Sequence, residues 1–129
     1  MIAYLGTGLL GANFVKALLR NGKQVNVWNR TEAKAKALEA DGAAFFEDPA
    51  DAVEGADRIH LTLSDDAAVD EVLDRARSGF KHGVIIIDHT TTTAQGAMKR
   101  AALWEDRGFS YIHAPVFMGP PNALDCSGY

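Results

Sequence analysis

A glycine motif close to the N-terminus is the feature that most constrains the fold of this chain. The motif, Gly6-Thr7-Gly8-Leu9-Leu10-Gly11, directly follows the apolar residues 2–5 and opens a helix-forming segment at 10–20. In a strand, turn and helix of this kind, Gly6 permits the tight turn, Gly8 lets the backbone approach a pyrophosphate, and Gly11 lets the helix pack closely on the strand. The N-terminus of the helix favours an anion there. The motif therefore predicts a dinucleotide site, and a purely structural glycine turn is the alternative.

Short apolar segments alternate with segments of helical period along the chain. Six strands are expected, at residues 2–5, 25–29, 43–46, 58–63, 84–88 and 109–113. Helices are expected between them, at residues 10–20, 32–40, 50–54, 67–76 and 94–107. A glycine stands just before five of the strands, where a helix end commonly needs a left-handed residue: Gly22, Gly42, Gly55, Gly83 and Gly108. Apolar strands separated by helices predict an α/β fold with a doubly wound, mostly parallel six-stranded sheet of the Rossmann type.

Length and charge exclude several classes of protein. The 129 residues fit one main domain, and 13 Lys and Arg against 17 Asp and Glu give a net charge of −4. Mild acidity with mixed charges argues against holding nucleic acid or an anionic membrane. The single cysteine, Cys126, cannot form an internal disulfide, and no Cys/His spacing predicts a metal site. The N-terminus has no basic segment or long apolar stretch, so we expect no signal peptide or membrane span and a cytoplasmic location.

The residues after the second expected strand predict which dinucleotide binds. An acidic residue near this point usually holds the adenosine 2′-hydroxyl of NAD, whereas this chain has Asn29, Arg30 and Thr31. Arg30 can offer a forked pair of charge-assisted donors to a 2′-phosphate, and Asn29 and Thr31 can add hydrogen bonds. This pattern favours NADP as the cofactor. In the alternative interpretation, Arg30 is a solvated surface residue and Thr31 is only the N-cap of the next helix.

Five segments in order carry a family resemblance that covers the whole chain. They are the glycine motif, residues 27–31, 61–69 and 87–91, and Ala114-Pro115-Val116. Together they resemble the β-hydroxyacid dehydrogenase superfamily, which includes 3-hydroxyisobutyrate dehydrogenases, tartronate semialdehyde reductases, 6-phosphogluconate dehydrogenase and the imine reductases. The resemblance implies that residues 1–113 are the dinucleotide-binding half of a two-domain NADP-dependent oxidoreductase. Residues 114–129 would be a tail leading toward a missing all-helical half, which in this family forms the homodimer and supplies much of the active site.

The resemblance also implies further cofactor contacts. Leu63 and Ser64 match the family segment that passes the adenosine side of the cofactor, and Thr90 and Thr91 match hydroxyl residues near the nicotinamide ribose. The threonines also follow a strand, at the edge where open α/β sheets bind ligands. The alternative for Ser64, or for Asp65 beside it, is an N-cap of the next helix, and the alternative for the threonines is a helix cap in a Thr-rich loop.

The residues after Ala114-Pro115-Val116 depart from the hydroxyacid members of the family. Those members carry Ser-Gly-Gly to hold a substrate carboxylate, whereas this chain has Phe117-Met118-Gly119. Phe and Met side chains cannot donate a hydrogen bond to a carboxylate, and their bulk would crowd the backbone approach that glycine permits. This disfavours a small hydroxyacid. Imine reductases depart at the same place toward apolar residues and prolines, so an apolar or cyclic imine is the other small-molecule substrate that stays open.

Other reactive side chains receive no catalytic role. The acid pairs Asp65-Asp66 and Asp70-Glu71 fall at a helix start, where negative charge suits the helix dipole, so we expect solvated caps. Four histidines are scattered without a nucleophile or ligand set at a diagnostic spacing: His60, His82, His89 and His113. For the last two, which follow strands, a structural or lining role is expected. The family's proton donor belongs to the missing half, so no catalytic residue is assigned in this chain.

Two other functions stay open beside the enzyme. A non-catalytic dinucleotide-binding module, acting as a sensor or scaffold, would also explain Phe117 and Met118. A nucleic-acid or protein adaptor that binds no cofactor would have to account for the glycine motif and Arg30, and the net charge of −4 does not support it.

Overall fold

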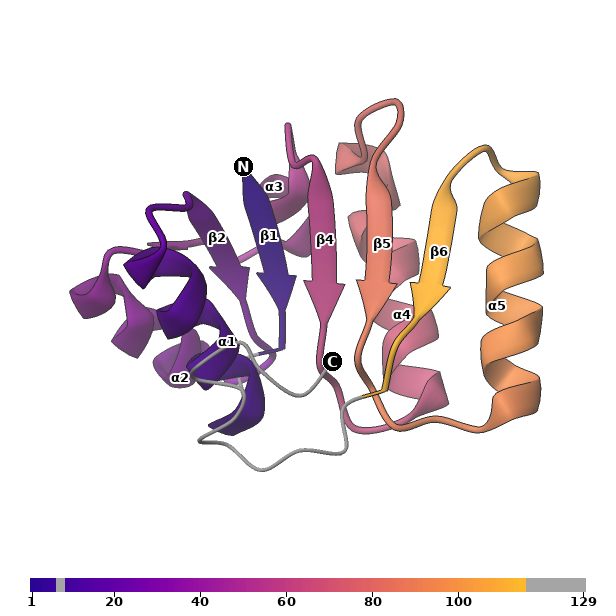
Figure 1. Cartoon of the computed structure of the whole chain (residues 1–129), viewed down its shortest axis with the longest axis horizontal. Coiled ribbons are helices and arrows are strands. Elements are labelled where there is room, and N and C mark those ends of the chain that lie inside the picture. The colour runs from indigo at the N-terminus through magenta and orange to yellow at the C-terminus, as the bar shows by residue number, and fades with distance from the viewer. Residues whose placement is uncertain (7–8, 116–129) are drawn as a thin grey trace.

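The computed structural model describes residues 1–6 and 9–115, which form a parallel sheet with helices on both faces (Figure 1). Within these residues the strands are β1 (Ile2–Leu5), β2 (Val25–Trp28), β3 (Ala44–Phe45), β4 (Arg58–Leu61), β5 (Ile85–Asp88) and β6 (Ser110–His113). They pair in the order β3-β2-β1-β4-β5-β6, and every pair is parallel. The predicted doubly wound α/β sheet is confirmed.

The helices of the described residues lie between the strands, as the alternating pattern predicts. They are α1 (Leu9–Arg20), α2 (Glu32–Lys36), α3 (Pro49–Val53), α4 (Asp66–Ala76) and α5 (Ala94–Asp106), with two short 3-10 segments, η1 (Ala37–Asp41) and η2 (Arg77–Gly79). The helix expected at 32–40 is divided, because the chain tightens into η1 before the left-handed turn at Gly42. The glycines expected to be left-handed all have positive φ: Gly22, Gly42, Gly55, Gly83 and Gly108.

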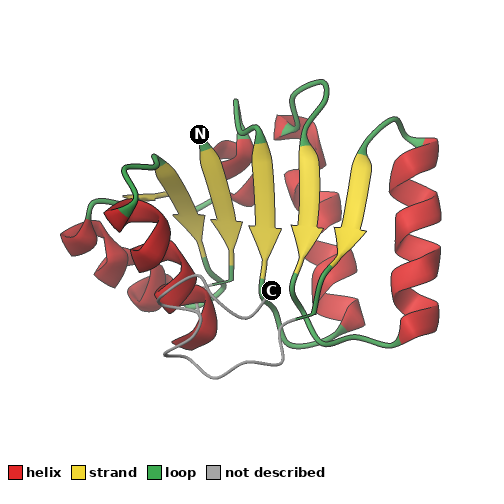
Figure 2. Ribbon diagram, viewed as in Figure 1, coloured by secondary structure: helices red, strands yellow, loops and turns green. Residues whose placement is uncertain are grey.

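Helices cover both faces of the sheet (Figure 2), and a hydrophobic cluster on each face holds these layers together. Side chains alternate between the faces along each strand. On one face, Tyr4 of β1 and Val27 of β2 pack with Phe14 of α1. The cluster on the opposite face joins strand residues to α3, α4 and α5: Ala3, Leu5, Ile59, Leu61, Ile86, Val53, Val69, Val72, Leu73 and Trp104.

The strand register brings the predicted site segments to one edge of the sheet. Leu5, the last residue of β1, is in register with Trp28 and Leu61, and Leu61 is in register with Asp88. The segments that begin at residues 6, 29, 62 and 89 therefore leave the sheet side by side. The strand order also reverses direction between β1 and β4, and such a switch point is where open α/β sheets bind ligands.

Glycine is required at two positions of this edge because backbones approach closely there. Gly6 has a φ of 91°, and a Cβ built on it would lie 2.2 Å from the carbonyl oxygen of Thr62, which follows β4. A Cβ on Gly11, in the first turns of α1, would lie 2.5 Å from the carbonyl oxygen of Gly6. The roles predicted for Gly6 and Gly11 therefore match the geometry. Thr7 and Gly8 lie outside the described residues.

We expect Gly6→Ala to destabilise the protein more than Gly55→Ala does. Both glycines have positive φ, 91° and 78°, so both substitutions impose left-handed strain of about 1–2 kcal/mol. At Gly55 nothing lies within 4 Å of the added Cβ, whereas at Gly6 it would overlap Thr62. Urea denaturation should show that Gly6→Ala lowers the free energy of unfolding by at least about 1 kcal/mol more. Equal losses would contradict the close approach of the chain after β4 to Gly6.

Candidate functional site

Three separately predicted segments meet beside the glycine turn. A Cβ on Gly6 would also lie 2.7 Å from Leu63 Cδ2, so the Leu63 side chain lies against this glycine. Leu63 N in turn donates a hydrogen bond to Thr90 Oγ1 at 3.0 Å. The strand expected at 58–63 ends at Leu61 because this Leu63 N–H bonds a side chain instead of a neighbouring strand. The structure therefore brings Gly6, Leu63 and Thr90 together.

The predicted cofactor-binding residues after β4 and β5 differ in solvent exposure. Thr90 is 1% exposed and Leu63 is half-buried, whereas Ser64 and Thr91 are exposed. Asp65, not Ser64, is the N-cap of α4, since its carboxylate accepts a hydrogen bond from Ala68 N at 2.8 Å. Thr93, not Thr90 or Thr91, caps α5 through a bond from Gly96 N. The hydroxyls of Ser64 and Thr91 are therefore not used as helix caps.

The residues predicted to select NADP lie at the end of β2, on the surface. Asn29 Nδ2 donates to the Thr31 carbonyl oxygen at 2.9 Å. Thr31 is the N-cap of α2 by position, but its side chain makes no capping hydrogen bond. Arg30 is exposed, and its Nη2 lies 3.3 Å from Glu71 Oε2 on α4. Arg30 is therefore exposed but not merely solvated, because its side chain contacts the carboxylate of Glu71. The sequence analysis did not predict this contact.

A buried polar network of Asp88, Tyr111 and Arg100 fixes the backbone of the loop that follows β5. Asp88 is fully buried at the end of β5, where its Oδ1 accepts from Thr90 N at 2.9 Å and its Oδ2 accepts from the Tyr111 hydroxyl. Arg100, on α5, donates to Tyr111 Oη at 3.3 Å. Because Asp88 fixes the backbone of Thr90, this network also positions the hydroxyl that binds Leu63 N.

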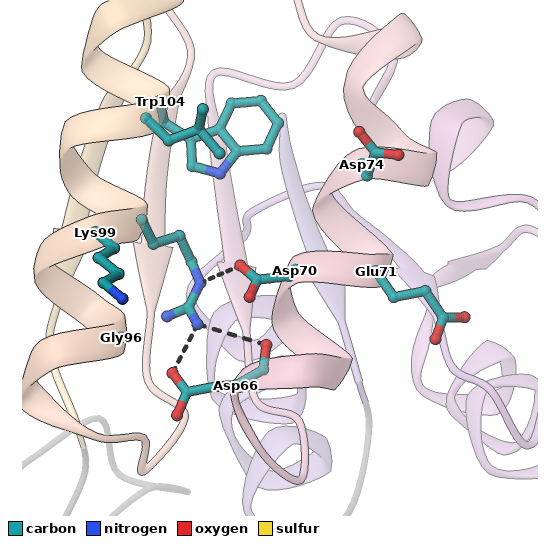
Figure 3. A pocket seen from close by; sticks show the side chains of 9 residues that line it. Asp66, Asp70, Glu71, Asp74, Gly96, Lys99 and Trp104 are labelled. Atoms are coloured by element: carbon teal, nitrogen blue, oxygen red, sulfur yellow. Dashed lines mark hydrogen bonds and ion pairs between the residues drawn. The ribbon is translucent and has the colours of Figure 1, made fainter.

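Arg100 overturns the expectation for two acidic residues. Arg100 is 2% exposed, and its guanidinium donates to Asp70 Oδ1 and to Asp66 Oδ1, each at 2.7 Å (Figure 3). The expectation that Asp66 and Asp70 are only solvated caps is wrong, since both carboxylates bind the buried Arg100, although the Asp70 side chain stays 59% exposed. The sequence contained a signal for this. Ala97, Arg100 and Trp104 share the buried face of α5, and an arginine on a buried face needs acidic partners.

Protonation of this network follows from its hydrogen bonds. Burial alone would lower the pKa of Arg100, but the bonds to Asp70, Asp66 and Tyr111 outweigh it and raise that pKa. The bond from Arg100, with those from Thr93, lowers the pKa of Asp66. Burial, together with the bond to Asp88, raises the pKa of Tyr111. Arg100 is therefore charged and Tyr111 protonated at neutral pH.

Two stacked histidines, His60 of β4 and His89 directly after β5, lie near the same end of the sheet. His60 of β4 and His89 have ring centroids 5.1 Å apart and are flanked by Tyr4 and Phe14. His89 Nδ1 lies 3.0 Å from the Ala114 carbonyl oxygen, which can only accept, so we assign the proton to Nδ1. Nε2 of a neutral His89 then accepts from His60 Nδ1 at 2.9 Å. This leaves His60 Nε2 as a buried acceptor without a hydrogen-bond partner among the described residues.

Burial keeps both rings neutral. Burial, with the charges of His89 and Arg58, lowers the pKa of His60 to about 3. Burial also lowers the pKa of His89. His113 lies nearby, with Nε2 donating to the Thr90 carbonyl oxygen at 3.1 Å. These contacts support the structural roles expected for His89 and His113.

Residues 1–6 and 9–115 contain neither a metal-binding cluster nor a membrane-spanning helix. No group of three or more His, Cys, Asp or Glu side chains in this part of the chain could hold a metal ion. None of its helices is both long and apolar enough to cross a membrane. The expected absence of metal stays a prediction. Cys126 and the segment Phe117-Met118-Gly119 lie outside the described residues.

Comparison with known proteins identifies the class to which this fold and site belong. Residues 1–127 match the family described as the NAD binding domain of 6-phosphogluconate dehydrogenase, and the chain belongs to that family. An uncharacterized oxidoreductase of Shewanella frigidimarina is 32% identical over 127 residues, which are 95% of this chain and 43% of the relative. The human cytokine-like nuclear factor N-PAC is 35% identical over 118 residues, 89% of this chain and 21% of that protein. The chain thus spans less than half the length of these relatives.

Solved structures agree with this assignment. The 3-hydroxyisobutyrate dehydrogenase of Mycobacterium tuberculosis superposes with a TM-score of 0.91 at 28% identity, over 95% of this chain and 42% of that one. An imine reductase of Myxococcus stipitatus in complex with NADP+ has a TM-score of 0.88 at 26% identity, over 95% of this chain and 43% of that one. Both belong to the superfamily that the sequence resembles.

We expect the stability of the protein to fall on acidification because His60 is buried in its neutral form. In the unfolded chain His60 has a pKa of about 6.5, whereas in the folded chain it is about 3. Between these values only the unfolded chain binds the proton. The free energy of unfolding should therefore fall by about 1.4 kcal/mol per pH unit from His60 as the pH drops below about 6.5. His89 adds to the fall in the same direction.

The measurement is urea denaturation at pH values between 6.5 and 5. His60→Asn can still donate toward His89 but does not titrate, so its stability should depend less steeply on pH. His82 is exposed, so His82→Asn is the matched control and should keep the wild-type slope. A wild-type slope in His60→Asn would contradict the buried neutral histidine.

Proposed function

We propose that this chain is the cofactor-binding part of an NADP-dependent oxidoreductase that transfers a hydride between nicotinamide and a small-molecule substrate. The observation that carries the proposal is the close packing at the switch point of the sheet. Neither Gly6 nor Gly11 has room for a Cβ, because the carbonyl oxygens of Thr62 and Gly6 lie against them beside the N-terminus of α1. Arg30 follows β2, and neither of its sequence neighbours is a carboxylate. The family assignment and the likeness to an imine reductase bound to NADP+ support it.

The residues present fit a dinucleotide laid along the carboxyl ends of the strands. The backbone from Gly6 through Thr7, Gly8, Leu9 and Leu10 to Gly11 would hold the pyrophosphate at the start of α1. Asn29, Arg30 and Thr31 would bind the 2′-phosphate, Leu63 and Ser64 would line the adenosine side, and Thr90 and Thr91 would lie near the nicotinamide ribose. When bound, nicotinamide supplies the hydride acceptor or donor. The chain itself binds and orients it, and the buried network of Asp88 and Arg100 keeps the Thr90 loop in place.

The substrate and assembly are part of the same proposal. The substrate would be a hydroxyacid with its carbonyl product, or an apolar imine, bound next to a helical second half. That half would form a homodimer and supply the proton donor. We expect a cytoplasmic protein that needs no metal and binds neither nucleic acid nor membrane.

A second candidate function is a non-catalytic dinucleotide-binding module. The likeness to N-PAC favours it, since that relative is named as a nuclear factor and not for a reaction. The two candidates differ in turnover. The full-length protein should oxidise NADPH in the presence of a cyclic imine or a β-keto acid if it is an enzyme, and should bind NADPH without consuming it if it is a module.

We expect Arg30→Ala to weaken NADPH binding strongly and NADH binding hardly at all. A charge-assisted hydrogen bond to the 2′-phosphate contributes about 1.5–3 kcal/mol, which corresponds to roughly tenfold to a hundredfold in Kd. Added salt should narrow the difference between the cofactors. Calorimetric titration with each dinucleotide measures both affinities. Arg77→Ala removes an exposed arginine from η2, beyond the far end of α4, and serves as the matched control. Equal weakening of both cofactors by Arg30→Ala would remove the NADP assignment.

A further inference from the structure

The contact between Arg30 and Glu71 joins the cofactor edge of the sheet to α4. Arg30 follows β2 and Glu71 lies in the second turn of α4, so the two residues are 41 positions apart in sequence. Arg30 Nη2 and Glu71 Oε2 are 3.3 Å apart, with side chains 60% and 57% exposed. A single long contact between exposed side chains is weak and readily exchanged for a stronger partner.

The packing of α4 places Glu71 at this position. Asp66 and Asp70 bind Arg100 of α5, whereas Glu71 points away from these two carboxylates (Figure 3). Arg75, four residues after Glu71 and therefore on the same side of α4, lies over the ring of Trp28 with its Cζ 5.4 Å from the centroid. Trp28 is the last residue of β2 and is buried. The buried Trp28 thus holds this side of α4 next to the residues that follow β2.

We propose that Glu71 is a specificity-determining residue that competes with the 2′-phosphate of the dinucleotide for the guanidinium of Arg30. This inference rests on the proposed binding of the 2′-phosphate by Arg30. A dinucleotide without that phosphate leaves the pair intact, whereas NADP has to displace the Glu71 carboxylate. The carboxylate also repels a phosphate placed beside Arg30. Both effects weaken NADPH binding and leave NADH binding unchanged. Glu71 therefore reduces the difference in affinity by which the site prefers NADPH over NADH.

The test removes the charge of Glu71 and keeps its shape. Glu71→Gln should tighten NADPH binding by about two- to fivefold from lost competition alone, with NADH unchanged. The cycle of wild type, Glu71→Gln, Arg30→Ala and the double variant shows whether the effect passes through Arg30. In the Arg30→Ala background no competition remains, so Glu71→Gln should change the Kd for NADPH by much less, through the direct repulsion alone.

A matched control separates competition from a general change in charge. Asp74→Asn removes the same charge from an exposed position one turn along α4 and should leave both affinities near wild type. Thermal denaturation of each variant checks that it is folded, and Glu71→Ala repeats the test with a different side chain. Calorimetric titration of the protein with NADPH and with NADH gives every Kd.

The outcomes separate this inference from the proposed function. If wild type prefers NADPH through Arg30 but Glu71→Gln leaves both affinities unchanged, the role of Glu71 is wrong and the NADP assignment stands. If Glu71→Gln weakens NADH binding, the carboxylate binds the ribose hydroxyl instead, which also overturns the inference. If Asp74→Asn has the same effect as Glu71→Gln, the effect is general electrostatics. If wild type shows no preference that depends on Arg30, the proposed function itself fails.

Discussion

The close approach of three backbone segments at Gly6 is the constraint on which the rest of the structure depends. The carbonyl of Thr62 comes so near Gly6, and the carbonyl of Gly6 so near Gly11, that neither glycine has room for a side chain. These contacts bring β1, β4 and α1 together at the switch point of the sheet. A helix N-terminus, the end of β2 and the loop after β5 therefore surround one place, and this arrangement suits a long anionic ligand such as a dinucleotide.

Buried polar groups fix the loops that surround this place. Asp88 holds the backbone of Thr90, Tyr111 and Arg100 hold Asp88, and the Thr90 hydroxyl accepts from Leu63 N. On the other face of the sheet, His89 binds the Ala114 carbonyl and is supported by His60. Because such groups are costly to leave unpaired, each loop has one favoured position. Ser64, Thr91 and Arg30 stay exposed at this edge, and the exposed pair Arg30 and Glu71 has the proposed role of adjusting cofactor choice.

Local patterns in the sequence predicted the elements but not the pairing of distant side chains. The parallel sheet, the left-handed glycines and the close backbone packing at Gly6 and Gly11 follow from apolar alternation and glycine spacing, and each was confirmed. Asp66 and Asp70 were misread because their partner, Arg100, lies about 30 residues away on another helix. Glu71 was missed for the same reason. A local pattern shows that an arginine lies on a buried face, but only the packing of α4 against α5 shows which acids it meets. Every cofactor contact predicted from the sequence stays a prediction.

The most direct test of the account is a titration of the isotopically labelled protein with NADPH, followed through its backbone amide resonances. The account predicts that the resonances that change most belong to residues at the carboxyl ends of the strands, namely Gly6, Gly11, Arg30, Thr31, Leu63, Ser64, Thr90 and Thr91. The left-handed turns at Gly22, Gly55, Gly83 and Gly108 precede strands at the opposite edge and should not change. Changes concentrated at those turns, or no change at any concentration of NADPH in folded protein, would contradict it.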